Sequence, residues 1–451
     1  MTNSETKNFS QNVSSSYHLE DRGKCNKNTC ANARNVPKLR FKGYNDEWKK
    51  IKLGEHLNIC RGASPRPIEK YITVENNGVN WIKIGDISPK ENVIKCTKEK
   101  ITIEGAKHSR YVRKGDLILS NSMSFGRPYI LEIDGCIHDG WLLIQDLEKL
   151  FDKKYLCYLL DSDTVKQQYR KYAAGGVVIN LNSELVRSVK VYIPNFREQE
   201  KIASFLTLID KKIEKQKELV ELLKKYKRGL LSAIFSQKLR FKDDNGNNYP
   251  AWEECRFDEI FQILRNNTLS RECLNYTDAG VKNIHYGDIL VKYNTCINDE
   301  IDKIPNINSD INLDKISDDN YLKVGDVIMA DTAEDYTVGK ACEIVSCKAK
   351  ILSGLHTIPC RPKRNFAKGY LGYYLNSAEY HDKLIPLITG IKVSAISKKE
   401  IKKTIIKYPI YMEQAKIANL LILIENKLNS NIKKLELLET YKKGLLQQLF
   451  I

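Results

Sequence analysis

Two stretches of the chain share one hydrophobic pattern, in which apolar residues recur at spacings of three and four. The first stretch runs through Ile202, Leu206, Ile209, Ile213, Val220, Leu223 and Leu230, and the second through Ile417, Leu421, Ile424, Leu428, Leu435, Leu438 and Leu445. This spacing is typical of a coiled-coil seam, and neither stretch contains proline. The pattern predicts two long helices, over 198–237 and 413–451, each roughly 55–60 Å long at 1.5 Å per residue.

One position in the seam of each predicted helix is polar. Gln216 and Asn431 occupy equivalent places near the middle of the two helices. If the helices pair antiparallel, their midpoints meet, and a buried pair of amides there would fix the register at some cost in stability. The alternative is that both side chains point to solvent.

The sequence before each predicted helix has a different pattern. Short runs rich in β-branched and aromatic residues alternate with turn signals, as in Lys-Gly-Asp-Leu-Ile-Leu-Ser (114–120) and Val-Gly-Asp-Val-Ile-Met-Ala (324–330). Helical stretches are expected at 154–172 and 368–387. We therefore predict a mixed α/β domain over 37–197 and a second one over 238–412. Residues 1–36 are polar and without periodicity, and are expected to form a disordered tail.

The two halves of the chain repeat each other. Lys-Leu-Arg-Phe occurs at 38–41 and 238–241, and the strand-like segment at 111–119 returns at 321–329. The helix opening at 198–206 returns at 413–421, after which the offset stays at 215 residues. A changing offset followed by a constant one indicates a variable domain joined to a helix of fixed length. The predicted fold class is α+β, with a pseudo-two-fold internal repeat.

Composition narrows the choice of partners. The chain has 451 residues, with 73 Lys and Arg against 56 Asp and Glu, a formal net charge of +17. This excess favours nucleic acid or an anionic membrane surface as partner, unless it only reflects a biased genome. There is no apolar run of membrane-spanning length and no apolar leader segment. The 12 cysteines form no Cys-x-x-Cys, so reduced thiols and a cytoplasmic location are expected.

Catalytic and cofactor motifs are missing from the sequence. It contains no Gly-x-Gly, no phosphate-binding loop, no His-Glu-x-x-His and no Asn/Asp-Pro-Pro-aromatic motif for holding a target amine. Strings such as Glu69-Lys70 and Asp302-Lys303 arise by chance in a chain with 29% charged residues. We therefore expect no catalytic residue, no enzyme activity of its own, and no metal or cofactor bound by this chain.

The ends of the predicted helices carry a resemblance to a known family. The helices open Pro-x-x-x-Glu-Gln-x-Lys-Ile-Ala at 194–203 and 409–418, and end Tyr-Lys-x-Gly-Leu-Leu-x-x-x-Phe at 226–235 and 441–450. Together with the duplication and the repeated Lys-Leu-Arg-Phe, this arrangement resembles the specificity (S) subunit of Type I restriction–modification systems. The resemblance covers residues 37–451 and leaves the first 36 unexplained.

The resemblance implies a function in defence against foreign DNA. Each variable domain would be a target recognition domain that reads one half of a bipartite double-stranded DNA site, and two antiparallel coiled-coil helices would join the domains and set the gap between half-sites. Two modification subunits, which methylate adenine with S-adenosylmethionine, and two restriction subunits, which use ATP and Mg, would dock on this chain. No membrane partner is implied.

Polar loops beside the predicted strands are the candidates for DNA contact, because Arg, Lys, Asn, Ser and Asp side chains hydrogen-bond to base edges and phosphates. The loops lie at 61–66, 120–127 and 175–182 in the first domain, and at 265–271, 331–340 and 390–394 in the second. The candidates are Arg61, Ser64, Arg66, Ser120, Asn121, Ser122, Ser124, Arg127, Asn180, Asn182, Arg265, Asn266, Asn267, Arg271, Asp331, Thr332, Tyr336, Lys340, Lys392 and Ser394.

The two sets of loops differ in charge. The second domain has Asp331, Glu334 and Asp335 where the first has the neutral segment Ser-Asn-Ser-Met-Ser-Phe-Gly-Arg. Carboxylates accept hydrogen bonds from cytosine, so we expect the two half-sites to differ. Simpler alternatives are that 120–127 is only a hydrogen-bonded turn and that Arg61 and Arg66 only touch phosphate. Trp81, Trp141 and Tyr158 are expected in the core.

Two other functions are compatible with the sequence. The chain is also consistent with a duplicated coiled-coil adaptor without DNA sequence specificity, in which the basic charge is incidental. The remaining alternative is a nuclease that uses carboxylates not grouped in any motif.

Overall fold

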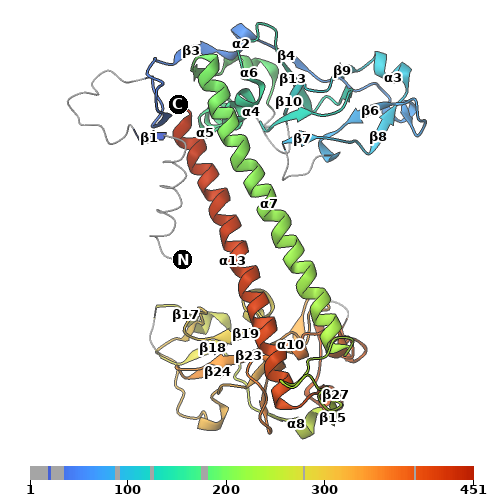
Figure 1. The fold of residues 1–451 in the computed structure, drawn as a ribbon, viewed down its shortest axis with the longest axis vertical. Helices are drawn as coiled ribbons and strands as arrows, with labels where there is room; N and C mark the ends of the chain where they lie inside the picture. The colour runs from blue at the N-terminus through green and yellow to red at the C-terminus, as the bar shows by residue number, and fades with distance from the viewer. Residues whose placement is uncertain are drawn as a thin grey trace, which may run out of the picture. The chain divides into compact units, whose positions relative to one another are not determined.

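The structure is a computed structural model that describes residues 19–21, 35–86, 92–121, 126–173, 181–277, 280–390 and 393–451. The chain forms two compact units (Figure 1). The first unit contains residues 1–217 and 433–451, and the second contains residues 218–432. Each unit therefore combines one α+β domain with the beginning of one long helix and the end of the other.

The first domain is built on a five-stranded sheet. Its order is β4 (Leu57–Arg61), β13 (Trp141–Asp146), β10 (Leu117–Ser120), β11 (Pro128–Leu131) and β7 (Val93–Ile94). The central strand β10 is buried along its whole length, as the apolar run after Gly115 predicts. It pairs antiparallel with β13, Leu119 opposite Leu142. Trp81, Trp141 and Tyr158 are buried, which confirms their expected place in the core.

A second five-stranded sheet and short elements complete the first domain. The sheet has the order β5 (Ile72–Thr73), β8 (Glu99–Ile101), β6 (Val79–Ile82), β12 (Gly135–Ile137) and β9 (Arg110–Val112). Two ribbons pair β3 (Lys49–Lys52) with β14 (Lys190–Ile193) and β1 (Leu19–Asp21) with β2 (Leu39–Phe41). The helices are α2 (Leu53–His56), α3 (Ile103–Lys107), α4 (Lys153–Asp161), α5 (Asp163–Ala173) and α6 (Ser183–Ser188), with 3-10 turns η2 (Ile68–Lys70) and η3 (Ile84–Asp86).

The strand β1 corrects one expectation, because it lies inside the segment predicted to be a disordered tail. Leu19–Asp21 pair antiparallel with Leu39–Phe41. The backbone of β2 supplies the hydrogen-bond partners of this strand, and a polar segment without periodicity gives no sign of such pairing. The other residues between 1 and 34 lie outside the described part of the chain.

The second domain repeats this topology. Its five-stranded sheet has the order β16 (Phe261–Ile263), β25 (Thr357–Pro362), β21 (Val327–Ala330), β23 (Ala341–Ser346) and β19 (Cys296–Asn298). Its second sheet has the order β17 (Leu274–Asn275), β20 (Asn306–Ile307), β18 (Lys282–Ile284) and β24 (Ile351–Ser353). The ribbons are β15 (Glu253–Arg256) with β27 (Ile405–Tyr408) and β22 (Thr332–Ala333) with β26 (Ser394–Ala395). The helices are α8 (Phe257–Ile260), α9 (Tyr286–Val291), α10 (Tyr370–Leu375), α11 (Ala378–His381) and α12 (Lys398–Ile401), with η4 (Arg271–Cys273), η5 (Asp318–Asn320) and η6 (Ile385–Leu387).

The predicted helix at 154–172 is divided in two. Ser162 has extended backbone between α4 and α5, and its hydroxyl accepts a hydrogen bond from the Val165 N–H at 3.4 Å. Ser377 occupies the corresponding place between α10 and α11 and is also extended. A serine favours such a position because its side chain replaces a backbone partner, an effect that apolar periodicity does not reveal.

The long helices are α7 (Phe196–Phe235) and α13 (Tyr411–Leu449), and each begins two residues before the expected boundary. The side chain of Asn195 accepts from the Glu198 N–H at 3.0 Å and so caps α7. In the first unit, Ile209 and Ile213 near the start of α7 share one core with Leu438 and Leu445 near the end of α13. The two helices are therefore antiparallel there.

The second unit shows the reverse combination. Val220 and Leu223 of α7 pack with Leu428 of α13, and further along Leu230 shares a core with Ile424. Here the end of α7 lies against the start of α13, so the helices are again antiparallel. The apolar positions of the predicted seam thus form the helix contacts within each unit.

The polar seam residues belong to different units, Gln216 to the first and Asn431 to the second. Gln216 is 7% exposed, so it does not point to solvent. The amide of Asn431 donates to the Lys427 carbonyl of its own helix at 2.8 Å. Their mutual pairing stays a prediction.

No helix in the described parts of the chain has the length and apolar character that crossing a membrane requires.

Candidate nucleic-acid interface

The motifs shared by the two halves hold each domain on its helix. Arg40 of the first Lys-Leu-Arg-Phe forms a bidentate pair with Glu198, with Nε–Oε1 and Nη2–Oε2 distances of 2.8 Å, and both side chains are buried. Arg240 of the second copy pairs with Glu413 at 2.7 Å in the same way. The hydrogen bonds that Arg240 donates to Glu413 raise the pKa of Arg240. These repeated charged residues are therefore structural.

The glutamine that follows each of these glutamates is structural as well. The Gln199 side chain accepts from the Asp152 N–H at 3.0 Å and donates to the Leu150 and Pro194 carbonyls. Gln414 repeats two of these contacts, with the Ala367 N–H at 2.9 Å and the Pro409 carbonyl at 2.8 Å. The glutamine thus anchors the helix start to the loop before α4 or α10.

Asn121, directly after the buried strand β10, joins two of the predicted DNA-contact loops in the first domain. Its carbonyl accepts from the Leu181 N–H at 2.9 Å, which connects the loop at 120–127 with the loop at 175–182. Its N–H donates to the Gly140 carbonyl, and its amide donates to the Asp139 carbonyl at 3.0 Å. Asn121 itself is buried, so its role is to hold these loops together.

The third predicted loop, at 61–66, contacts Asp139, the residue to which the Asn121 amide donates. Ser64 donates to Asp139 Oδ1 at 2.9 Å, and Arg61 Nε donates to the Asp139 carbonyl at 3.0 Å. The guanidinium groups of Arg61 and Arg66 lie 4.0 and 3.7 Å from Asp139 Oδ2. Both arginines are largely exposed, at 65% and 83%. The structure therefore brings Arg61, Ser64, Arg66 and Asn121 to one junction.

Asp139 remains a carboxylate in this setting. Its partial burial alone raises its pKa, but the Ser64 hydroxyl, His138 and Arg61 outweigh that effect and lower the pKa below its ordinary value. His138 Nε2 lies 3.0 Å from Asp139 Oδ1, and its Nδ1 accepts from the Gly140 N–H. The junction thus has a fixed negative centre surrounded by donors.

The second domain has the same junction with different side chains. Asp331 follows the central strand β21 as Asn121 follows β10; its N–H donates to the His356 carbonyl, and its own carbonyl accepts from Ile396. Its carboxylate accepts from the Thr332 hydroxyl at 2.8 Å and lies 3.4 Å from His356 Nδ1. His356 is half exposed and has a left-handed backbone with φ of 55°.

The first loop of the second domain packs beside this junction. Asn266 donates to the Gly354 carbonyl and accepts from Lys398 Nζ at 3.1 Å. Asn267 donates to Asn283 at 2.6 Å. Arg271 pairs with buried Asp288 at 3.1 Å and keeps about half of its surface exposed (51%), while Arg265 is exposed at the loop's start.

Two of the candidates have their polar groups bonded inside their own domain. Ser120 is fully buried, and its hydroxyl accepts from the Arg127 N–H at 3.1 Å, so it closes a turn. Lys340 Nζ donates to the carbonyls of Leu290 and Tyr293 at 2.9 and 3.1 Å, and burial lowers its pKa. Both polar groups serve the interior of their own domain.

Other candidates have contacts inside the protein or lie outside its described part. Arg127 donates to Asn92 at 2.8 Å and lies over the Tyr129 ring, and Asn182 caps α6. Tyr336 is exposed, and Ser394 lies in β26 opposite Ala333. Ser122, Ser124, Asn180 and Lys392 lie outside the described residues.

Sequence reasoning missed Asp139, His138 and His356. All three lie in the loop before the strand next to the central one, β13 or β25. A polar pair directly before an apolar run, as in His-Asp-Gly-Trp (138–141), is a weak signal, and only the sheet order places it beside the other loops.

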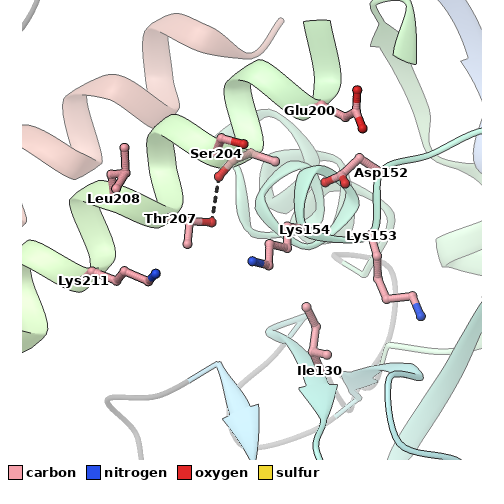
Figure 2. A pocket seen from close by; sticks show the side chains of 10 residues that line it. Ile130, Asp152, Lys153, Lys154, Glu200, Ser204, Thr207, Leu208 and Lys211 are labelled. Atoms are coloured by element: carbon pink, nitrogen blue, oxygen red, sulfur yellow. Dashed lines mark hydrogen bonds between the residues drawn. The ribbon is translucent and has the colours of Figure 1, made fainter. Parts of the chain in front are cut away.

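A separate pocket lies between the first domain and α7 (Figure 2). It has a volume of about 590 Å³. In Figure 2, Lys154 of α4 and Lys211 of α7 face one opening, with Ile130 on another wall. On the wall formed by α7, Thr207 donates to the Ala203 carbonyl at 2.7 Å. Leu208 lines the pocket and is 46% exposed.

The second domain differs at the equivalent position. Glu343 of β23 replaces Ile130 of β11, and its carboxylate accepts from the N–H groups of Gly369 and Gly372 at 2.7 and 2.9 Å. Burial raises the pKa of Glu343 to about 7, although these N–H groups lower it. Leu423 corresponds to Leu208 in the helix repeat and is 67% exposed. Both long helices thus present an exposed leucine at the same repeat position.

Among the residues that the structure describes, no three His, Cys, Asp or Glu side chains come together as a metal site.

The sequence is similar to those of known specificity proteins. Residues 45–224 match the family described as Type I restriction modification DNA specificity domain. The chain is 21% identical over 426 residues to the Type I restriction enzyme MjaVIII specificity subunit of Methanocaldococcus jannaschii, which covers 90% of this chain and 92% of that protein. The MjaIX specificity subunit of the same organism is 23% identical over 229 residues, 48% of this chain and 52% of that protein.

Solved structures share the fold. The S subunit of a Type I restriction-modification system from M. genitalium aligns with a TM-score of 0.52 and 15% identity, over 92% of this chain and 99% of that one. A chain from a study of complex assembly and conformational transition in a type I R-M system aligns with a TM-score of 0.55 and 17% identity, over 90% and 98%.

Proposed function

Because this chain belongs to the specificity subunits of Type I restriction–modification systems, we propose that its two α+β domains read the two halves of a bipartite DNA site. The observation that carries this proposal is the repeated junction. In both domains, the loops after the central strand, before its neighbour and before the short helix α6 or α12 meet through equivalent backbone hydrogen bonds.

The side chains at the two junctions support different half-sites. The first domain presents Arg61 and Arg66 around Asp139, whereas the second presents Asp331, Thr332 and His356 beside Arg271. Guanidinium groups favour guanine, and carboxylates accept from cytosine, so equal folds with unequal side chains read unequal bases. The net charge of +17 adds a salt-dependent attraction to phosphate that is independent of sequence.

We infer that this chain binds DNA in a complex with the other subunits of the restriction–modification system. Leu208 and Leu423 are exposed at equivalent positions of the two helices. This equivalence is an argument for two copies of a modification subunit, one bound to each helix repeat. Two restriction subunits would complete the complex. In this proposal S-adenosylmethionine, ATP and Mg belong to those partners, this chain carries no catalytic residue, and the complex works in the cytoplasm, where the DNA is.

Exchange of one domain tests the proposal. Residues 37–196 are replaced by the equivalent domain of another specificity subunit, and methylated positions are mapped across the genome of cells that contain the modification subunit. One half-site should change while the other half-site and the gap stay the same. A change in both half-sites, or methylation without a bipartite pattern, would contradict one domain for each half-site.

A further inference from the structure

Asp139 is the residue through which the polar loops of the first domain are connected. Its carboxylate accepts from Ser64 at 2.9 Å and lies 3.0 Å from His138. Its carbonyl accepts from both Arg61 Nε and the Asn121 amide at 3.0 Å, and its N–H donates to Ser64 at 3.3 Å. Asp139 therefore contacts the loops at 61–66 and 120–127 through its backbone and its side chain.

The two oxygens of the carboxylate have different neighbours. Oδ1 faces Ser64 and His138, whereas Oδ2 faces the guanidinium groups of Arg61 and Arg66. Oδ1 accepts a hydrogen bond from Ser64, whereas Oδ2 attracts the two guanidinium groups by charge from 4.0 and 3.7 Å. The two arginines keep most of their surface for an external partner.

Orientation matters for these arginines because guanidinium recognition is planar. An exposed arginine side chain that nothing restrains samples many rotamers. Its guanidinium group can then contact any phosphate, whatever the base sequence. A guanidinium held in one plane can donate two parallel hydrogen bonds to the O6 and N7 of guanine. Holding the side chain before DNA arrives lowers the entropy lost on binding.

We propose that Asp139 is a positioning residue of the first domain, which holds Arg61 and Arg66 as a fixed pair that reads guanine in the first half-site. This inference rests on the proposed function. The second domain has no counterpart among the described contacts, because its Arg271 pairs with Asp288 and its junction is built on Asp331 and His356.

The test uses the full chain assembled with its modification subunit and the bipartite site found for the wild type. Affinities are measured for DNA in which each base pair of both half-sites is varied in turn. Asp139→Asn keeps the shape of the side chain but removes its charge. We expect it to lose about tenfold of its discrimination at a G·C pair of the first half-site, equivalent to about 1.4 kcal/mol, with the second half-site unchanged.

Glu132→Gln is the matched control. Glu132 is exposed in the same domain, and its substitution changes the net charge by the same amount without touching the junction. This variant should discriminate like the wild type, which separates positioning from a general gain in attraction to phosphate. If Asp139→Asn also discriminates like the wild type, or weakens both half-sites equally, the positioning role is refuted.

A second variant keeps the inference testable if Asp139→Asn does not fold. Ser64→Ala removes one hydrogen bond to the carboxylate and leaves its charge. A smaller loss of discrimination at the same base pair is expected, and unchanged discrimination would overturn the inference. Failure of the wild-type complex to bind any bipartite site would instead contradict the proposed function.

Discussion

At the residue scale, the side chains repeated between the two halves are mostly structural, and those that differ form the candidate interface. Arg40 and Arg240 pair with Glu198 and Glu413, so the identity of these residues reflects the junction of domain and helix. The exposed side chains around the two junctions differ, with Arg61 and Arg66 in the first domain and His356 beside Arg271 in the second. Repetition therefore marks the scaffold, and divergence within it marks the positions available for recognition.

The buried pair of Arg40 and Glu198 makes a prediction about stability. Arg40→Ala leaves the Glu198 carboxylate buried without its bidentate partner, which typically costs about 3–5 kcal/mol of unfolding free energy. Arg240→Ala is the matched comparison, because Arg240 is 24% exposed and solvent can replace part of its contact. Chemical denaturation of both variants measures the difference. An equal or smaller loss in Arg40→Ala would contradict the prediction.

At the element scale, the ends of the helices depend on single polar side chains. Asn195 caps α7, Ser162 separates α4 from α5, and Glu343 accepts from two N–H groups at the start of α10. Apolar periodicity predicts the long helices because it extends over many turns. It does not predict the break at Ser162, because one hydroxyl there outweighs a continuing apolar pattern.

Glu343 gives the second unit a predicted pH dependence. Its pKa rises from the ordinary 4.5 to about 7 in the folded chain, so the folded state holds this proton more tightly than the unfolded state. The resulting stabilisation is complete below pH 4.5 and is lost as the pH rises through 7, by roughly 3 kcal/mol. Unfolding measured at a series of pH values should show this loss.

Glu343→Gln removes the titrating group and is the control for this slope. Its stability relative to the wild type should increase as the pH rises from 4.5 to 7, even if the uncharged amide lowers stability overall. A difference between the two proteins that does not vary with pH would show that Glu343 does not titrate in this range.

Asn431 tests the polar position in the predicted helix seam. If Asn431 pairs with Gln216, Asn431→Leu should raise the melting temperature and at the same time loosen the register, because an apolar residue would replace one partner of a buried amide pair. Circular dichroism measures the first effect, and cross-linking between cysteines placed on the two helices measures the second. An unchanged or lowered melting temperature would count against the pairing of Gln216 with Asn431.

At the scale of the whole molecule, the units do not coincide with the sequence repeats. The first repeat ends with α7, but the end of α7 belongs to the second unit, where Phe235 packs against Trp252 and Tyr374. The end of α13 belongs to the first unit, where Phe450 packs against Tyr155. Each domain is therefore completed by the helix end of the other repeat.

The helices also make a prediction about the DNA site. A four-residue insertion within α7 lengthens that helix by roughly 6 Å. At about 3.4 Å per base pair, the gap between half-sites should grow by roughly two base pairs. Methylation mapping in cells with the modification subunit reads the gap directly. An unchanged gap in an active complex would show that helix length does not set the spacing.

The duplication, the α+β class, the two long helices and the three loops of each domain that carry candidate side chains can all be predicted from the order of residues. These features follow from local periodicity and from repetition, both of which can be read along the chain. The loop at 61–66 was predicted as a candidate because its residue types suit DNA contact, although nothing local connects it with Asp139.

Which of those side chains lie close together depends on how the strands are ordered in the folded sheet. Strand order brings residue 139 beside residues 61–66, buries Ser120, and turns Lys340 towards the carbonyls of Leu290 and Tyr293. These outcomes depend on contacts between residues far apart in the chain, and burial outweighs residue type because a polar group inside a domain needs an internal partner. The hydrogen-bond partners of these side chains and their exposure to solvent are set when strands far apart in the chain pack into one sheet.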